Sequence, residues 1–130
     1  MTKILSFLGL CLLLSACQSL TYQEQRQLSE LQYKGISVDR PLGDWEKPAS
    51  PMKAGLLNIL PGVGNFYLGN GRAAQSEQNL YGFLNLLTWP ISILWGIPVA
   101  AIDADTVNKR DLLMYYQYDE RGKEFYKSIN

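Results

Sequence analysis

The chain contains no histidine, and this absence excludes several kinds of chemistry at once. A Ser-His-Asp triad, a histidine base and the commonest zinc ligand are all ruled out. An excess of charge of either sign is also lacking, because 12 Lys and Arg residues balance 12 Asp and Glu residues. A balanced chain has neither a basic footprint for nucleic acid nor a polybasic patch for a membrane surface. We therefore expect no nucleic-acid partner and no catalysis that depends on histidine.

Cysteine is nearly absent too, but one of the two cysteines carries the strongest signal in the chain. Lys3 precedes a short apolar run at 4–14, which is the pattern of a secretory signal peptide and is too short to cross a bilayer. The run ends in Leu14-Ser15-Ala16-Cys17, which resembles the lipobox of bacterial lipoproteins. The resemblance implies that residues 1–16 are removed and that Cys17 becomes the acylated, palmitate-bearing first residue. The alternative is an ordinary signal peptide followed by an incidental cysteine.

Lipidation would place the protein in the bacterial cell envelope, anchored in membrane lipid and facing the periplasm. Gln18 stands where an aspartate commonly retains lipoproteins in the inner membrane, which slightly favours the outer membrane. Cys11 leaves with the signal peptide, so no free thiol remains for a disulfide, a zinc site or a nucleophile. We expect no metal and no cofactor.

Residues 17–51 are predicted to form a tether helix and a linker. Thr21 and Glu24 have capping-box spacing, which marks the start of a polar helix. Gly35 lies where the C-terminal glycine of that helix would fall. Residues 36–51 contain three prolines, which are excluded from a helix interior, so this stretch is interpreted as a Pro-rich linker.

Residues 52–105 are predicted to form an apolar helical hairpin, with apolar segments at 54–68 and 80–102 around a polar turn at 69–79. The second segment has 23 residues and no charge, long enough to span a bilayer, although Pro90 and Pro98 would kink it. Asp103 and Asp105 end the apolar run, and we expect an aspartate to cap a C-terminal amphipathic helix from 106 to about 118. Residues 106–130 form this helix and a tail, with Gly122 weakening or ending the helix. The predicted fold class is all-α: signal helix, polar helix, Pro-rich linker, apolar helical hairpin and C-terminal amphipathic helix.

The first apolar segment ends in a glycine-rich sequence. Gly62, Phe66, Tyr67 and Gly69 resemble the first-helix exit of the small two-transmembrane-helix (TM-two) domain family, and Asp103 matches the aspartate that ends its second helix. The resemblance covers residues 52–105 and implies architecture more than activity, because the molecular activity of that family is poorly defined. The alternative is a glycine-softened apolar hairpin of a kind that any membrane-seeking segment can acquire. The candidate residues of a structural turn, where close helix approach or positive backbone dihedrals are expected, are Gly62, Gly64, Phe66, Tyr67 and Gly69.

The charges argue against a hairpin that spans the membrane. With Cys17 outside, spanning would expose the turn at 69–79 to the cytoplasm. Basic residues favour the cytoplasmic side, yet this turn has only Arg72. Five basic residues flank the hairpin instead: Arg40, Lys47, Lys53, Lys109 and Arg110. We slightly favour a kinked hairpin that packs on itself or dips into one leaflet.

Two further motifs receive structural interpretations. Gly69, Gly71 and Ala74 have the spacing of a dinucleotide fingerprint but follow no convincing strand. Asp103 and Asp105 have no nearby carboxylate except Asp111, so helix capping explains them better than a metal site.

We expect a non-catalytic, lipid-anchored envelope protein that scaffolds or modulates a membrane complex, through an unknown envelope protein or through self-association. The alternative is a membrane-perturbing factor whose Gly-rich hairpin oligomerises in the bilayer.

Overall fold

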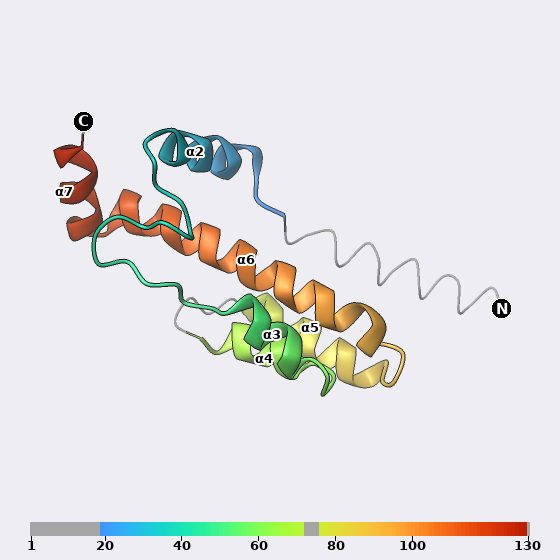
Figure 1. Ribbon diagram of the computed structural model, residues 1–130. Helices are drawn as coiled ribbons and strands as arrows, with labels where there is room; N and C mark the ends of the chain where they lie inside the picture. Colours follow the sequence, from blue (N-terminus) through green and yellow to red (C-terminus); the bar gives the residue numbers. More distant parts are fainter. Residues whose placement is uncertain (1–18, 72–75, 130) are drawn as a thin grey trace.

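The computed structural model describes residues 19–71 and 76–129, and this part of the chain forms six helices (Figure 1). They are α2 (Tyr22–Tyr33), α3 (Pro51–Leu57), α4 (Val63–Gly69), α5 (Ser76–Leu87), α6 (Ile93–Tyr118) and α7 (Glu120–Ser128). The same residues contain no strand, only an isolated bridge between Ser37 and Arg40. The all-α prediction is confirmed. The predicted signal segment at 1–16 and Cys17 lie outside the described residues.

Helix α2 begins and ends where local hydrogen bonds determine its limits. The backbone N–H of Glu24 donates to the Thr21 hydroxyl at 3.3 Å, and the Glu24 carboxylate accepts from the Thr21 N–H at 2.7 Å. At the other end, Gly35 has a φ of 81° and donates to the carbonyl of Gln32, while the next N–H donates to the carbonyl of Leu31. This is the Schellman arrangement, which a glycine adopts without steric cost. The expected capping box and terminal glycine are confirmed.

The proline-rich segment after α2 is fixed along α6. Trp45 is buried and donates its indole N–H to Asp111 at 2.8 Å. Asn108 forms a pair of hydrogen bonds with the backbone of Ala49, accepting at 2.9 Å and donating at 2.8 Å. A buried amide that satisfies both groups of one residue fixes the path of the chain at that point. The linker therefore reaches α3 in a defined position.

The predicted hairpin consists of three short helices and the first part of α6. Gly62, with a φ of 83°, separates α3 from α4, so the segment at 54–68 is two helices. The segment at 80–102 is also divided, because α5 ends at Leu87 and α6 begins at Ile93. The kink expected at Pro90 is thus a complete break, since proline has no N–H to continue the helical ladder and clashes with the preceding turn. Pro98, in contrast, lies inside α6.

Helix α6 is the longest element, and it corrects the expected start of the C-terminal helix. It continues through Asp103 and Asp105, so no helix begins at 106 and neither aspartate is a cap. The charges are tolerated because other groups partner them, as described below. Asp119 instead caps α7 by accepting from the N–H of Arg121 at 2.9 Å. Gly122 lies within α7 and does not end the preceding helix.

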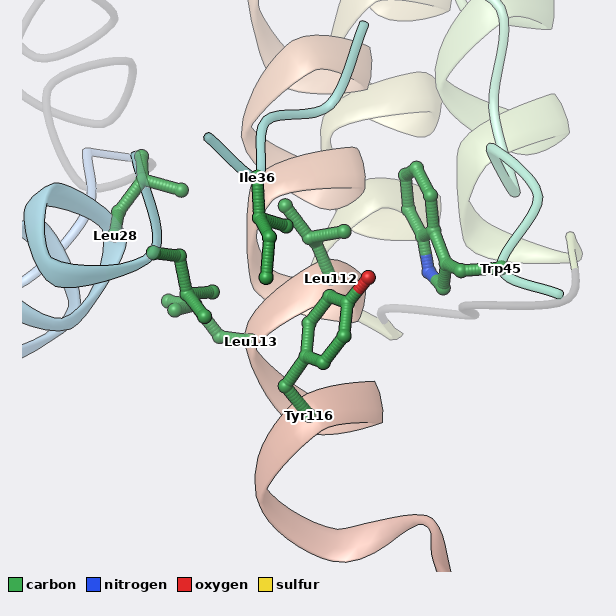
Figure 2. Close-up of a cluster of buried hydrophobic side chains, with 7 residues drawn as sticks. Leu28, Ile36, Trp45, Leu112, Leu113 and Tyr116 are labelled. Atoms are coloured by element: carbon green, nitrogen blue, oxygen red, sulfur yellow. The ribbon is translucent and has the colours of Figure 1, made fainter. Parts of the chain in front are cut away.

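Two hydrophobic cores lie along α6. The first joins α2, the linker and the C-terminal part of α6 through Leu28, Leu31, Ile36, Trp45, Leu112, Leu113 and Tyr116 (Figure 2). The second consists of Ala49, Ala54, Leu68, Ala100, Ala104 and Val107. Its small side chains let α3 and α4 approach α6 closely, since each added methylene would need space in a packed interior.

We distinguish two lobes along α6, and the second core extends into both of them through Ala49 and Val107. We call residues 51–71 and 76–102, which comprise α3, α4, α5, the described turns and the start of α6, the apolar lobe. We call α2, residues 34–50, residues 106–118 and α7 the polar lobe. Figure 1 shows α3, α4 and α5 gathered beside one end of α6, with α2 and α7 toward the other. No described helix combines the length and the apolar character needed to cross a membrane.

Candidate functional site

A chain of hydrogen-bonded side chains fills the interior of the apolar lobe. The Trp95 indole donates to Asn85 Oδ1 at 3.3 Å, and Asn85 Nδ2 donates to Asn65 Oδ1 at 2.9 Å. Asn65 Nδ2 then donates to Gln78 Oε1 at 2.8 Å, and Gln78 Nε2 donates to Asp103 Oδ2 at 3.1 Å. These residues come from α4, α5 and α6, so the chain joins three helices. Asn65, Gln78 and Asp103 are buried, where each unpaired polar group would be costly.

The two ends of this chain determine the orientation of every amide in it. The Trp95 indole can only donate a hydrogen bond, and an ionised Asp103 can only accept one. Each amide between them must therefore accept on the Trp95 side and donate on the Asp103 side. The amide dipoles add in one direction and place their positive ends toward the carboxylate, which favours its charged form.

Asn58 connects this chain to α3 and to the backbone of α6. Its Nδ2 group donates to the carbonyl of Gly96 at 2.6 Å and to Asn65 Oδ1 at 3.2 Å. Its Oδ1 atom accepts from the backbone N–H of Gly64 at 3.0 Å. One buried amide thus holds together the end of α3, the start of α4 and the start of α6.

Asp103 has opposing influences on its charge. Burial raises the pKa of Asp103 above its ordinary value of 3.8, while the Gln78 hydrogen bond and the positive charge of Arg110 act to lower it. Asp105, two residues further on, is partly exposed and pairs with Lys109 at 2.6 Å. No group of three His, Cys, Asp or Glu side chains that could hold a metal occurs in the ranges that the structure describes.

The glycines of the predicted turn are in close contact with other helices. A Cβ on Gly62 would overlap the carbonyl oxygen of Gly82 in α5, and Gly62 also has a positive φ. A Cβ on Gly64 would overlap the carbonyl oxygen of Ala54 in α3. Only Gly62 lies in a turn. The description of a five-residue turn is corrected, because Gly64, Phe66, Tyr67 and Gly69 belong to α4.

The aromatic residues of α4 contact different neighbours. The Phe66 ring lies against Gly82, where an added Cβ would be 3.0 Å from two ring carbons. The Tyr67 hydroxyl accepts from the backbone N–H of Ser50 at 3.2 Å, and its ring lies 5.8 Å from the Lys53 ammonium. The two aromatics therefore connect α4 with α5 and with the start of α3.

Large apolar side chains cover the outside of the apolar lobe. Of the seventeen large hydrophobic residues that are exposed in the described ranges, twelve belong to this lobe. They are Met52, Leu56, Ile59, Leu60, Leu80, Phe83, Leu86, Leu87, Trp89, Ile91, Leu94 and Ile102. Between residues 54 and 102 the sequence has only Arg72 and Glu77 as charges. The lobe thus has amides and small residues inside and large apolar groups outside, which reverses the usual order of a protein in water.

Sequence reasoning missed the interior role of the amides. Asn58, Asn65 and Asn85 lie within segments whose overall apolar character predicts a hairpin, and Gln78 lies within the predicted polar turn at 69–79. One signal was available, since Gln78 and Asn85 are seven residues apart and so lie on the same face of α5. Comparison with protein-family models, with curated proteins and with solved structures finds no match to this chain.

Proposed function

We propose that the protein is a non-catalytic, lipid-anchored envelope protein that scaffolds or modulates a membrane complex. Removal of the signal helix at 1–16 would leave acylated Cys17 as the lipid anchor. The chain would face the periplasm, and the outer membrane is favoured over the inner membrane. The apolar hairpin would provide a second attachment to the membrane phase, and the polar lobe would face the aqueous compartment.

The observation that carries this proposal is the contrast between the two lobe surfaces along one continuous helix. The apolar lobe exposes twelve large hydrophobic residues, whereas helices α2 and α7 expose charged pairs such as Arg26 with Glu30 and Arg121 with Asp119. A single helix, α6, contributes to both lobes. Such a molecule can hold an aqueous partner at a set distance from an apolar phase, which is the geometry that a scaffold needs.

The polar lobe offers a surface for such a partner. A cavity of about 550 Å³ lies between the linker and α6, lined by Trp45, Tyr115 and several acidic residues. Met114 and Tyr118, which also line it, are exposed large side chains. Aromatic and methionine side chains beside a concave surface are typical of protein interfaces.

The proposal is tested by photocrosslinking in cells. A photoreactive amino acid at Tyr118 should produce a discrete adduct with another envelope protein or with a second copy of this chain. The same amino acid at Tyr33, which is exposed but does not line the cavity, is the matched control and should produce none. Absence of an adduct at Tyr118, or equal labelling at both positions, would contradict the scaffold function.

The structure offers no separate support for the membrane-perturbing alternative. That alternative uses the glycines to bring several copies together, but Gly62 and Gly64 are already in contact with α5 and α3 of the same chain. Its test is dye release from liposomes by the purified mature protein.

A further inference from the structure

We propose that the apolar lobe inserts into one leaflet of the bilayer, with its two tip turns near the midplane and the start of the polar lobe at the headgroups. The inference rests on the proposed function, to which it adds the partner of the apolar surface and the depth of contact. The partner is the acyl chains of membrane lipid.

The chain enters the apolar lobe through α3 and leaves it through α6 at the same end of the lobe. Ala49 contacts Asn108, Gly55 lies against Ile97, and Asn58 bonds to Gly96, so α3 runs antiparallel to α6. Helix α5 also runs antiparallel to α6, because Gln78 bonds to Asp103 while Asn85 bonds to Trp95. The turns at 58–62 and 88–92 are therefore together at one end. The start of α5 lies at the level of Asp103, because Gln78 bonds to that residue.

Apart from Gly62, every residue of the tip turns that has a backbone N–H pairs it within the protein, as hydrocarbon requires of a polypeptide backbone. In lipid an unpaired N–H costs several kcal/mol, so it must find a partner within the protein. The N–H groups of residues 58–60, 63, 88, 89 and 91–94 all donate to backbone carbonyls at 3.0–3.4 Å. That of Gly64 donates to the Asn58 side chain, and Pro61 and Pro90 have no N–H. Ordinary loops leave many of these groups to water.

Lipid explains the exposed residues better than a protein partner does. The apolar side chains lie on α3, both tip turns, α5 and α6, so three of the four helices of the lobe and both turns share them. A protein partner would cover one face, whereas acyl chains reach every side. The exposed indole of Trp89 adds an apolar group at the tip.

The dimensions match one leaflet. The uncharged part of α6, residues 93–102, has ten residues and rises about 15 Å. Half of the hydrocarbon core is also about 15 Å thick. Asp103 and Asp105 follow at the level where headgroups would begin.

From the start of the described chain, the predicted lipid anchor can reach the same level. Arg110 donates to the carbonyl of Ser19 at 3.3 Å, which holds the start of the described chain beside α6. Arg110 is eight residues beyond Ile102, or about 12 Å along the helix, and the two residues from Ser19 to Cys17 can span about 7 Å. The acylated cysteine can therefore reach a headgroup layer that is about 5 to 8 Å thick. The anchor and the lobe would enter the same leaflet.

The experiment places one spin label at a time on the mature, acylated protein in vesicles of phosphatidylethanolamine and phosphatidylglycerol. Acylation blocks Cys17, so a newly introduced cysteine is the only reactive thiol. Leu60→Cys and Leu94→Cys report on the tip, Ile102→Cys on the headgroup level, and Tyr33→Cys is the aqueous control. All four side chains are exposed, at 67%, 82%, 64% and 94%, so the substitutions leave the cores intact. Collisions with oxygen, which concentrates in hydrocarbon, are compared with collisions with a water-soluble nickel chelate.

The expected result is a high ratio of oxygen to nickel collisions at Leu60 and Leu94, a lower ratio at Ile102 and the lowest at Tyr33. Labels at Leu60 and Leu94 that meet nickel as often as Tyr33 would show that the lobe is not inserted. If the labels at Leu60 and Leu94 collide rarely with both oxygen and the nickel chelate, protein covers them. Access to nickel at Leu60 only from the vesicle interior would show a spanning lobe. Each of these three results overturns the inference. If a Tyr118 adduct persists beside any of them, the proposed function stands and only the leaflet insertion fails.

Discussion

Asn65 is the residue at which loss of one side chain should damage the apolar lobe most. Its side chain accepts from Asn58 and Asn85 and donates to Gln78, and it is completely buried. Asn65→Ala leaves the Asn85 donor and the Gln78 acceptor without partners, whereas Asn58 keeps its bond to Gly96. The buried Gln78 acceptor costs about 1 to 3 kcal/mol when orphaned and the half-buried Asn85 donor costs less, so the free energy of unfolding should fall by about 1 to 5 kcal/mol. That loss is a large part of the stability of a typical domain.

The measurement is equilibrium unfolding in urea, followed by tryptophan fluorescence of the mature protein in a mild detergent. Asn70→Ala is the matched control, because Asn70 is exposed and water can replace its bonds to Phe66 and Asn79. Its cost should stay within about 0.5 kcal/mol. The double variant Asn65→Ala, Gln78→Ala should cost less than the sum of the two single variants by about 0.5 to 3 kcal/mol, since the two residues share one bond. Equal costs for Asn65→Ala and Asn70→Ala, or strict additivity of the pair, would refute the coupled amide chain.

Four further predictions concern titration, packing, topology and anchoring. Because burial raises the pKa of Asp103, the folded state binds its proton more tightly than the unfolded state, so stability should fall as pH rises from 3.8 through the raised value. Asp103→Asn should abolish that fall in urea titrations, and an unchanged slope would contradict the assignment. Replacing Gly62 and Gly64 with valine should lower the steady-state amount of the protein and its protease resistance without abolishing lipidation, because both added side chains overlap backbone carbonyls. An unchanged amount would show that the valine side chains are tolerated. A cysteine at Ser76 should react with an impermeant maleimide once the outer membrane is opened, whereas reaction only after inner-membrane lysis would place it in the cytoplasm. Cys17→Ala should lose labelling by a fatty-acid analogue, and equal labelling of the two proteins would exclude the anchor.

Local interactions explain why some elements were predictable. The limits of α2 follow from Thr21, Glu24 and Gly35, whose hydrogen bonds join residues only three to five positions apart. A disturbance at Pro90 has the same local origin, since a proline lacks the N–H that the helical ladder needs, but Pro98 lacks it too and lies inside α6. Interactions of this kind are present in the sequence itself, and no distant partner is required to establish them.

Asp103 shows where sequence reasoning failed. An aspartate after a long apolar run is normally read as the end of a segment and as a helix cap. In the structure α6 continues through it, because Gln78, which is 25 residues earlier in the sequence, donates a hydrogen bond to the carboxylate. Asn108 is a similar case, since its partner Ala49 is 59 residues away. A contact across such a separation cannot be inferred from spacing along one helix.

The sequence by itself determined the helical class, the limits of α2, the position of the linker and the low charge of residues 54–102, because composition and short-range hydrogen bonds are sufficient for each. It also carries the expectation of an acylated Cys17, which lies outside the described residues. Only the tertiary structure decided which of the polar residues in the apolar region lie inside and which of the large apolar residues lie outside. The polar Asn65 is buried and the apolar Leu94 is exposed, which is the reverse of what their polarities predict. This arrangement becomes evident only when four helices bring the amides together. The physical reason is that a buried amide is stable only with partners, and the partners of Asn65 come from two other segments of the chain, the end of α3 and helix α5.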